Sequence, residues 1–498
     1  MSKKLITLLL AMLLLSSTVA CSGGETAETS AADNTSSAET AAETKEDANE
    51  VDFSSMSFIE RIKHTNSSIA DNLPDKSYGG ATFKIYSSNT IMPDELTGEA
   101  LNDAQYAQKT TIEERFDVKV EYIQSEWVNN WDGYVGGMQA LFFAGDYFAD
   151  IIQNWNTSNA GFVTQGFYTD LSQFDSIDTS KPWYFGDEME LYSYKGHMYV
   201  ATGFMNTENV FNGMNAILYN KTIGTQYNIE NLYDVVRDGR WTLDYVTTLT
   251  SDFYIDVNGD GTRDNADIYA MNYASAGSWM CTLATLGVPQ IDKDAEGNLF
   301  ISVYGNAEKA QSIMDAMMTL TTQNGAIAAS DWEYEIFMPG NALLGACDLS
   351  RLAQLRNANF DYGVLPPWKA DEAQENYYTS YLPNPWSIPI SSPDPERAAV
   401  LMTAFAAEGY KQVIPVCYEN TIKTKYSTDE ESGEMVDLML NNVRADGMFL
   451  YGASSYIYNL WNYMRSNQGF GSYWTAQQKS LEKTFSDTTA AFDAMIGD

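Results

Sequence analysis

Residues 256–267, DVNGDGTRDNAD, contain four carboxylates that could bind a metal ion and two glycines that allow a tight turn. Oxygen-bearing side chains stand at positions 1, 3, 5, 9 and 12 of this segment, and Gly261 stands at position 6. Calcium takes six to eight hard oxygen ligands, and EF-hand loops supply them at this spacing, with a backbone carbonyl at position 7. The segment therefore predicts a calcium site. Its expected ligands are Asp256, Asn258, Asp260, Thr262, Asp264 and Asp267.

The loop differs from the usual EF-hand at its last position, where Asp267 replaces glutamate. Aspartate is one methylene shorter, so the chain would have to pass closer to the ion; dockerin modules carry a similar loop that ends in aspartate. The alternative is a solvated Asx-Gly turn that binds no metal. The sequence holds one such loop, and no catalytic base lies beside it. We therefore expect a structural calcium ion.

Most catalytic chemistries lack the residues they need. The only histidines are His64 and His197, which is too few for a histidine-rich metal cluster or a metalloprotease helix. His197 lies in YKGHMYVATG, where we expect a hairpin turn, and no nucleophile elbow accompanies it. The glycines form neither of the common nucleotide-binding patterns. A glycosidase, which needs only two carboxylates, remains open as an alternative.

The N-terminus indicates export and a lipid anchor. Lys3 and Lys4 precede an apolar run, residues 5–15, and small residues follow it. This is the pattern of a signal peptide, and the run is too short for a permanent membrane span. Cys21 comes next, in a context that resembles the bacterial lipobox, although Thr18 replaces the usual aliphatic residue. We expect lipidation of Cys21; the alternative is an ordinary signal peptide that happens to contain a cysteine.

Residues 22–50 should form a disordered tether behind this anchor. The segment contains no aromatic residue and has a net charge of −7. Such a chain cannot bury enough apolar surface to offset its loss of entropy on ordering. The whole protein has a formal charge of −38, which repels phosphate backbones and argues against nucleic-acid binding. The remaining cysteines, Cys281, Cys347 and Cys417, are expected in the core rather than in a disulfide framework.

The globular part begins with alternating strands and helices. YGGATFKIYSSN predicts a strand, GEALNDAQYAQKTTIEERF a helix and DVKVEYIQ a second strand. A helical WDGYVGGMQALFFAGD then leads to ADIIQNWNT, a short apolar strand. This order is typical of a mostly parallel sheet, in which ligands bind beyond the carboxyl ends of the strands. Trp155 follows the third strand at such a position. Thr242 is expected to cap a later helix.

Several short motifs share the order found in a known family. They are FFAGDYFADII, KGHMY, AILYNK, RWT, the acidic loop followed by IYAMN, and DYGVLPPWK. From residue 78 onward the chain resembles bacterial extracellular solute-binding proteins of ABC importers, most closely the carbohydrate-binding, maltodextrin-receptor-like class. A longer segment at residues 203–215, GFMNTENVFNGMN, departs from that pattern.

The resemblance implies an α/β fold of the periplasmic-binding-protein type. Two lobes would enclose a ligand cleft, about three chain crossings would join them, and binding would close the hinge. The expected divisions are a signal peptide at 1–20, a lipidated cysteine and tether at 21–52, a first lobe at 78–202 and 362–415, and a second lobe at 203–361 and 416–498.

The resemblance also implies a receptor rather than an enzyme. The protein would capture a sugar or oligosaccharide and deliver it to the permease subunits of an ABC transporter. We expect a monomer that the lipid anchor holds at the outer face of the cytoplasmic membrane. The alternative is a surface-anchored carbohydrate-active hydrolase, with the acidic loop as its dockerin-like feature. A dockerin, however, carries two loops in tandem at a domain edge, whereas this chain has one loop in mid-sequence.

Aromatic residues make up 13% of the chain and include 11 tryptophans, which suits a sugar ligand. Sugar rings lie with their CH faces on indole and phenol rings, while polar side chains bind the hydroxyls. The same tryptophans are candidates for the core, as we expect for Trp183 and Trp241. Arg351 has an alternative role in a surface ion pair. The expected ligand-binding residues are Trp155, Asn206, Trp279, Asp348, Arg351, Trp386 and Tyr458, with Trp461 as an alternative to Tyr458.

Overall fold

The computed structural model describes residues 56, 60–62, 64, 69–88, 92–127, 130–155, 159–206, 211, 213–273, 282–302, 307–328, 335–419, 430–444, 446–451 and 470–497. All of them belong to one compact unit, Phe53–Asp498. The other unit, Met1–Asp52, lies outside the described residues. The signal peptide, the lipidated Cys21 and the tether therefore stay predictions.

A four-stranded sheet forms the first lobe. Its strands lie in the order β12-β3-β1-β2, with β1 parallel to both β2 and β3 and β12 antiparallel to β3. The predicted strand–helix–strand–helix–strand order is confirmed. The strands and the connecting helices are β1 (Ala81–Ser87), α3 (Ala100–Phe116), β2 (Val118–Gln124), α4 (Trp131–Ala144), β3 (Ile151–Gln153) and β12 (Trp386–Ser387).

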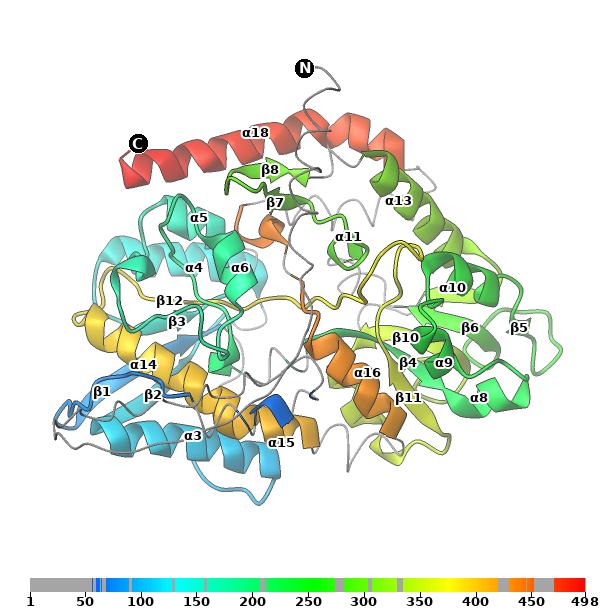
Figure 1. Cartoon of the computed structure of the whole chain (residues 1–498), viewed down its shortest axis with the longest axis horizontal. Helices are drawn as coiled ribbons and strands as arrows, with labels where there is room; N and C mark the ends of the chain where they lie inside the picture. Colours follow the sequence, from blue (N-terminus) through cyan, green and yellow to red (C-terminus); the bar gives the residue numbers. More distant parts are fainter. Residues whose placement is uncertain are drawn as a thin grey trace, which may run out of the picture. The chain divides into compact units, whose positions relative to one another are not determined.

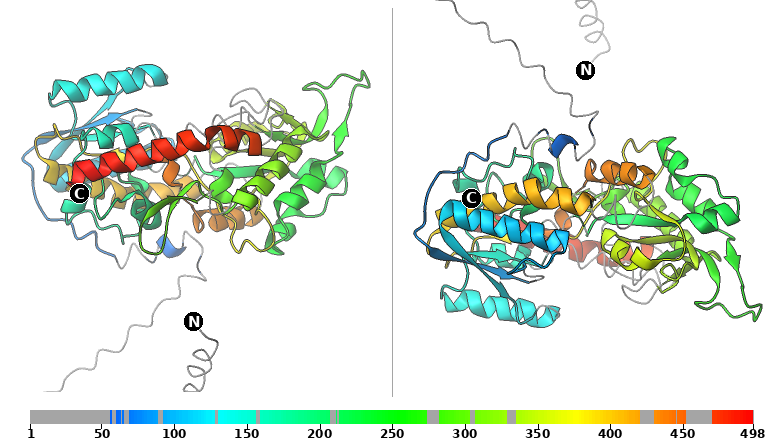
Figure 2. Two further views of the ribbon diagram at one scale, coloured as in Figure 1. Left: turned by 90° about the horizontal axis from the view of Figure 1, so that it is seen from above. Right: turned by 90° about the horizontal axis from the view of Figure 1, so that it is seen from below.

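Helices cover both faces of this sheet (Figures 1 and 2). Helix α3 packs with α14 (Pro395–Glu408) on one face, and α4 lies on the other. Side chains alternate along a strand, so Phe83 and Ile85 of β1 join the core under α3 and α14, while Tyr86 joins the core under α4. The lobe is completed by α5 (Asn159–Thr164), η3 (Leu171–Gln173), α6 (Gly186–Tyr192), η4 (Phe204–Asn206), the π-helical η7 (Gly409–Val413) and α15 (Ile414–Tyr418).

A six-stranded sheet forms the second lobe. Its main order is β11-β4-β10-β6-β5, and β9 also pairs with β6. Strand β10 is parallel to β6 and antiparallel to β4, so the C-terminal ends of β10 and β6 meet at one edge. The strands are β4 (Asn215–Asn220), β5 (Tyr254–Ile255), β6 (Ile268–Tyr273), β9 (Ala326–Ala328), β10 (Ala342–Asp348) and β11 (Tyr362–Leu365).

The remaining elements come from the segments between β4 and β11 and from the chain after α15, and several of these helices have side-chain caps. The hydroxyl of Thr242 accepts a hydrogen bond of 3.3 Å from the Tyr245 backbone N–H, which confirms the predicted cap. The elements are α8 (Lys221–Gln226), α9 (Leu232–Arg237), α10 (Leu243–Thr250), α11 (Thr282–Thr285), the hairpin of β7 (Ile291–Lys293) and β8 (Leu299–Ile301), α13 (Ala307–Thr322), η6 (Leu349–Asn357), α16 (Glu430–Leu440) and η9 (Gly447–Phe449).

Between the described elements of the two sheets the chain crosses three times, as the resemblance implied. It passes from the first lobe to β4, returns between β11 and β12, and leaves again after α15 for α16, which packs on β11. Strand β11 pairs with β4 in the second sheet. Placing residue 362 in the first lobe was therefore wrong, because the return follows Leu365 rather than preceding Tyr362. The bounds at 203 and 416 were also wrong, because η4 packs on α14 and α15 packs on α3, both in the first lobe. The motif DYGVLPPWK had suggested an early return, but its strand completes the second sheet.

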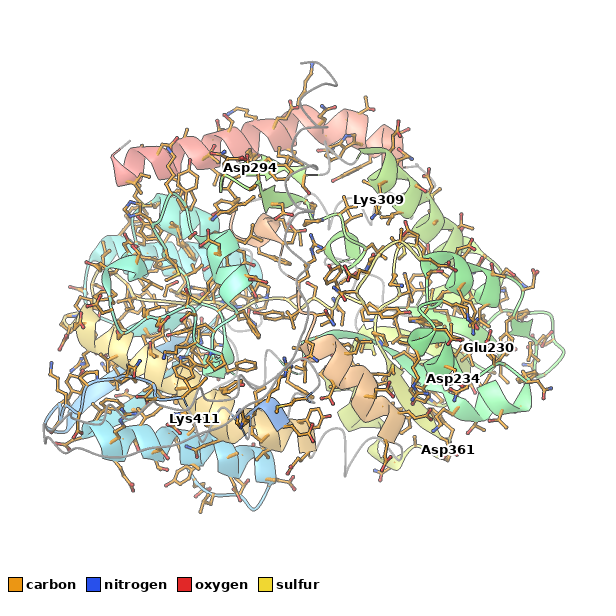
Figure 3. The ribbon with its side chains drawn as sticks, in the orientation of Figure 1. Glu230, Asp234, Asp294, Lys309, Asp361 and Lys411 are labelled. Atoms are coloured by element: carbon orange, nitrogen blue, oxygen red, sulfur yellow. The ribbon has the colours of Figure 1, made fainter. Side chains whose placement is uncertain are left out.

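Ion pairs attach α16 to the second lobe after the last crossing. Arg237 of α9 pairs with Asp234 at 2.8 Å on its own helix, and with Glu431 at 3.1 Å and Glu434 at 2.7 Å on α16. Figure 3 labels Asp234 on this surface of the second lobe. The carboxylates come from segments about 200 positions apart in the sequence, and one guanidinium links them at the surface.

The C-terminal helix, α18 (Phe470–Ile496), contacts elements from both halves of the fold. It packs against α5 of the first lobe and α13 of the second, and Figure 1 shows it passing above both. Phe492 of α18 is fully buried beside Tyr194 and Tyr451. Among the described residues, none of the helices combines the length and the apolar composition that crossing a bilayer requires.

Candidate ligand-binding site

Polar side chains gather where β1 and β3 end. These strands are parallel, so their carboxyl ends meet at one edge of the sheet, where open α/β sheets bind ligands. Ser87 Oγ donates a hydrogen bond of 2.7 Å to Gln153 Oε1, and both side chains are buried. The side-chain nitrogen of Gln153 has no hydrogen-bond partner among the described residues. Because an unsatisfied buried donor costs about 1–3 kcal/mol, this edge favours a polar ligand or water.

Trp155 lies just beyond β3 at this edge, where the sequence placed it. Its ring is partly buried and its centroid is 6.3 Å from that of Tyr134, a buried residue of α4. The Tyr134 hydroxyl donates a hydrogen bond of 2.9 Å to Asn154 Oδ1. Burial raises the pKa of Tyr134, so its hydroxyl keeps its proton and stays a donor. Trp155 therefore packs beside an aromatic and hydrogen-bonded base, and the residue is partly exposed.

Trp127 is a second aromatic residue at this edge, and the sequence analysis did not select it. It follows β2, the strand next to β1, and the residue is partly exposed. The ring packs over Gly133 and Gly137 of α4. The signal was present in WVNNWDGYVGG, because the two glycines stand four positions apart on a predicted helix. A tryptophan three residues beyond a strand end and beside such a helix could have been selected on that ground.

Trp386 belongs to the core, and its selection as a ligand-binding residue is corrected here. It is only 2% exposed. Its backbone exchanges hydrogen bonds with Ala201 at 2.8 and 2.9 Å, and its ring centroid lies 5.7 Å from that of Phe405 in α14. The proline-rich segment before it returns as strand β12 beside β3, so the indole faces the helix layer rather than solvent.

The other selected residues belong to other elements or lie outside the described residues. Asp348 ends β10 in the second sheet, where its carboxylate accepts the backbone N–H of Ser350 at 3.0 Å and caps η6. Arg351 follows within η6 and is half-buried. Asn206 is the last residue of η4. Trp279, Tyr458 and Trp461 lie outside the described residues. The described site therefore consists of Trp155 and its neighbours on the first sheet.

A buried carboxyl lies beside the chain crossing that leads back to the first lobe. Glu188 of α6 is 4% exposed and accepts a hydrogen bond of 2.9 Å from the Tyr381 hydroxyl. Tyr381 belongs to the segment between β11 and β12. Burial raises the pKa of Glu188 to about 7. No local signal in the sequence identifies this pair, because its members stand 193 positions apart.

His197 has a structural partner. Its Nδ1 lies 2.6 Å from Oδ2 of Asp170, and its backbone pairs with Tyr194 across the predicted hairpin turn. The Asp170 carboxylate also accepts the backbone N–H groups of Ser172 and Met198. The carboxylate of Asp170 therefore holds both the His197 ring and the turn in place. Among the described contacts, no nucleophile is hydrogen-bonded to the imidazole.

The acidic loop is stabilised by hydrogen bonds to its own backbone. Asp256 accepts the N–H groups of Gly259 at 2.7 Å and Gly261 at 2.8 Å, and Asp260 accepts that of Thr262 at 2.7 Å. Asp267, at the end of the loop, accepts the Tyr254 hydroxyl at 2.8 Å. The contact between the first aspartate and the sixth residue closes the loop around Gly261, whose φ is 71°.

The side-chain oxygens of the loop are of the type that calcium binds. Their carboxylates, however, are not arranged around a common point in this structure. Across the described residues, which include the whole loop, no three histidine, cysteine, aspartate or glutamate side chains lie close enough to hold a metal ion. The carboxylates point instead to backbone N–H groups, as in the alternative Asx-Gly turn. Calcium binding therefore stays a prediction, and it would require the side chains of Asp256, Asp260 and Asp264 to converge.

No protein-family model and no curated protein matches the chain. Solved structures do match. UgpB from Mycobacterium tuberculosis, in complex with glycerophosphocholine, is 16% identical, with a TM-score of 0.54 over 82% of this chain and 100% of that one. The galacto-N-biose/lacto-N-biose I-binding protein of an ABC transporter from Bifidobacterium longum is 12% identical, with a TM-score of 0.52 over 84% of this chain and 98% of that one.

The GacH receptor of Streptomyces glaucescens, solved without ligand and with acarbose, is also similar. It is 13% identical, with a TM-score of 0.51 over 84% of this chain and 99% of that one. At such identities the similarity establishes the fold. The chain has the two-lobed α/β fold of ABC-transporter substrate-binding proteins, as the resemblance predicted.

Proposed function

We propose that this protein is an extracellular solute-binding protein that captures a carbohydrate and delivers it to an ABC importer. The observation that carries the proposal is the position of Trp155, a partly exposed residue beyond the carboxyl end of β3 in this fold. This edge is where open α/β sheets bind ligands. An indole face packs on the CH face of a sugar ring, and neighbouring amides and hydroxyls bind its edge.

A neutral polyhydroxylated ligand suits the site better than an anion. The buried amide nitrogen of Gln153 has no hydrogen-bond partner among the described residues, and the amide oxygen accepts a hydrogen bond from Ser87 at the strand ends. The net charge of −38 disfavours a strongly anionic solute. Two of the structural neighbours were solved with an oligosaccharide or acarbose, and UgpB with glycerophosphocholine, so both classes of ligand belong in the test.

The remaining parts of the proposal come from the sequence. Lipidation of Cys21 and the acidic tether, residues 22–50, would hold the globular unit at the outer face of the cytoplasmic membrane. Permease subunits would receive the ligand there after the lobes close. Calcium in the loop of residues 256–267 would stabilise the second lobe and take no part in chemistry.

A thermal-shift screen of the full-length chain in detergent tests the function. Anything that binds only the folded protein raises the unfolding midpoint. The panel contains mono- and oligosaccharides and glycerophosphocholine. Trp155→Ala should abolish the shift, and Phe143→Ala, which removes a 71% exposed aromatic ring of α4, is the matched control.

Three outcomes separate the alternatives. A saturable shift with saccharides recovered unchanged, lost in Trp155→Ala alone, supports a carbohydrate receptor. A shift with glycerophosphocholine only would replace the ligand class. Recovery of cleaved saccharide would establish the hydrolase instead.

A further inference from the structure

The C-terminal end of α6, residues 190–195, is contacted by segments that come from far along the chain. This helix belongs to the first lobe. The last carbonyl groups of a helix have no partner within the helix and need one elsewhere. Here the side chains that reach this stretch come from three segments, which stand 103, 260 and 299 positions later in the sequence.

The first segment is the hairpin of β7 and β8. It stands in the sequence between β6 and β9, which pair with each other, so the hairpin projects from the second lobe. The Lys293 ammonium group donates hydrogen bonds to the Glu190 carbonyl and, at 2.9 Å, to Ser193 Oγ. The Lys293 side chain is only 12% exposed, and its Nζ lies 3.3 Å from the Glu190 carboxylate. The hairpin therefore ties the second lobe to α6.

The second segment follows α16 of the second lobe and ends at Tyr451. This residue is fully buried, and its hydroxyl lies 3.2 Å from the Leu191 carbonyl and 3.0 Å from the Ser193 carbonyl. Shortly before it, the buried Asp446 accepts the backbone N–H of Ile291, the first residue of β7, at 3.3 Å. The hairpin and Tyr451 are therefore joined to each other as well as to α6.

The third segment is α18, which packs on α13 of the second lobe and on α5 of the first. Its Asp493 accepts the Tyr194 hydroxyl at 2.8 Å and lies 2.8 Å from Lys195 Nζ. The neighbouring Phe492 is fully buried beside the rings of Tyr194 and Tyr451. The β7–β8 hairpin, Tyr451 and α18 thus converge on one end of α6, and we call these three segments the strap.

The strap meets a chain crossing on the same helix. Tyr381, in the crossing between β11 and β12, donates its hydrogen bond to Glu188, two positions before Glu190. Lobes of such a fold move by turning the chain at the segments that join them, and points close to the turn move little. The strap contacts can therefore persist through a small hinge motion. A wide separation would expose Phe492 and Tyr451 and take these partners from the α6 carbonyls.

We propose that the strap holds the second lobe to the end of α6 and thereby limits how far the two lobes separate in the ligand-free protein. It adds to the three crossings, because its contacts with α6 are made through side chains rather than through the continuous chain. A receptor with a narrow range of open arrangements has less motion to lose when it closes around a ligand. The proposal goes beyond the proposed function and holds for any class of ligand.

The test removes the polar contacts of the strap and keeps its apolar packing. Lys293→Met retains a long side chain without the ammonium group, and Tyr451→Phe retains the ring without the hydroxyl. The matched control combines Lys483→Met with Tyr273→Phe. Lys483 pairs within α18 itself, and the Tyr273 hydroxyl donates a hydrogen bond of 2.9 Å to the Thr321 carbonyl inside the second lobe.

The separation of the lobes is measured by pulsed electron–electron resonance between two spin labels. The labels are attached at Glu114→Cys of α3 and Thr225→Cys of α8, which are exposed positions on different lobes. The full-length chain also carries Cys21→Ser and Cys281→Ser, and the remaining cysteines are buried. Urea unfolding of each variant records its stability separately.

Without ligand, we expect the Lys293→Met, Tyr451→Phe double variant to gain a population at longer distance, while the control keeps the wild-type distribution. If the double variant does not fold, Lys293→Met alone is compared with Lys483→Met in the same measurement. A wild-type distribution in the strap variant overturns the proposal. The same longer population in the control also overturns it, because the change would then follow from lost stability. None of these outcomes requires a saccharide to bind, so the proposed function is tested independently.

Discussion

The hydroxyl of Tyr381 donates a hydrogen bond of 2.9 Å to Oε2 of Glu188, and this contact joins the returning chain segment to α6. The carboxyl is buried in the first lobe, away from any basic partner in the described contacts. Burial therefore controls its titration and raises its pKa to about 7, from an ordinary 4.5. This relationship makes the stability of the fold depend on pH near neutrality.

Stability should fall between pH 4.5 and 7. In this window the folded protein keeps a proton on Glu188 that the unfolded chain releases, so the stabilisation is complete below pH 4.5 and is lost as pH rises through 7. A shift of this size corresponds to about 3 kcal/mol. Glu188→Gln stays neutral and should remove this part of the slope in urea unfolding measured from pH 4.5 to 8. Asp446, whose pKa burial also raises, keeps its contribution in the variant. An unchanged slope in Glu188→Gln would contradict the assignment.

Arg397 should be essential for stability. Its Nη2 lies 2.7 Å from Oδ1 of Asp150, which is fully buried, while the Tyr147 hydroxyl and the Lys84 N–H bind the other oxygen. Removing one partner of a buried ion pair costs about 3–5 kcal/mol. Arg397→Ala should lose that amount in chemical denaturation.

The exposed pair of Lys483 and Asp487 on α18 is the control for Arg397. Both side chains are more than half exposed, so Lys483→Ala should change stability by at most about 1 kcal/mol. Equal losses in the two variants would show that burial of the Asp150 pair does not set its strength.

Phe492 should hold the end of α18 on the first lobe. Its ring is fully buried, 5.1 Å from the ring of Tyr194 and 5.7 Å from that of Tyr451. Phe492→Ala should cost about 3–5 kcal/mol and increase hydrogen exchange along α18. Asp493→Asn, which weakens the neighbouring exposed ion pair with Lys195, should cost less than about 1 kcal/mol. Protection of α18 in Phe492→Ala equal to that of the wild type would rule out this anchoring role.

Much of the fold was predictable because its signals are local. The alternation in residues 78–89 and the capping threonine, Thr242, read directly as a strand and a helix start. Trp155 was predictable because the position beyond a parallel strand follows from chain order. The other parts of the fold depend on strand pairing between segments that are far apart in the sequence. Trp386 is buried because its strand returns beside β3, and β11 completes the second sheet because it pairs with β4, more than 140 positions earlier.

The same distinction applies to the site. Trp127 could have been selected from the sequence, because Gly133 and Gly137 are four positions apart and share the helix face on which its ring packs. Glu188 needed Tyr381, which no spacing rule connects with it. Local patterns therefore indicate the edge where a ligand would bind, whereas the buried pair of Glu188 and Tyr381 depends on a contact between distant segments.

Cys21 should carry the lipid. Its lipobox-like context predicts that acylation anchors the mature protein, and one or more acyl chains then determine its partition into membranes. Metabolic labelling with a fatty acid should mark the wild type. Cys21→Ser should be unlabelled and released into the medium or the soluble fraction. Labelling that persists in Cys21→Ser would place the lipid elsewhere.

Calcium should stabilise the loop of residues 256–267. The negative charge that the ion needs can be removed by a substitution that keeps the hydrogen bonds of the loop. At a free concentration of about 100 times Kd, a bound ion adds about 2.7 kcal/mol to the unfolding free energy. Asp260→Asn keeps an oxygen that can accept the Thr262 N–H at 2.7 Å but removes one negative charge. The wild-type midpoint should therefore rise with calcium relative to chelator, and this increment should shrink in Asp260→Asn while the midpoint in chelator stays the same. Identical wild-type midpoints with calcium and with chelator would leave the loop as an Asx-Gly turn stabilised by its own backbone.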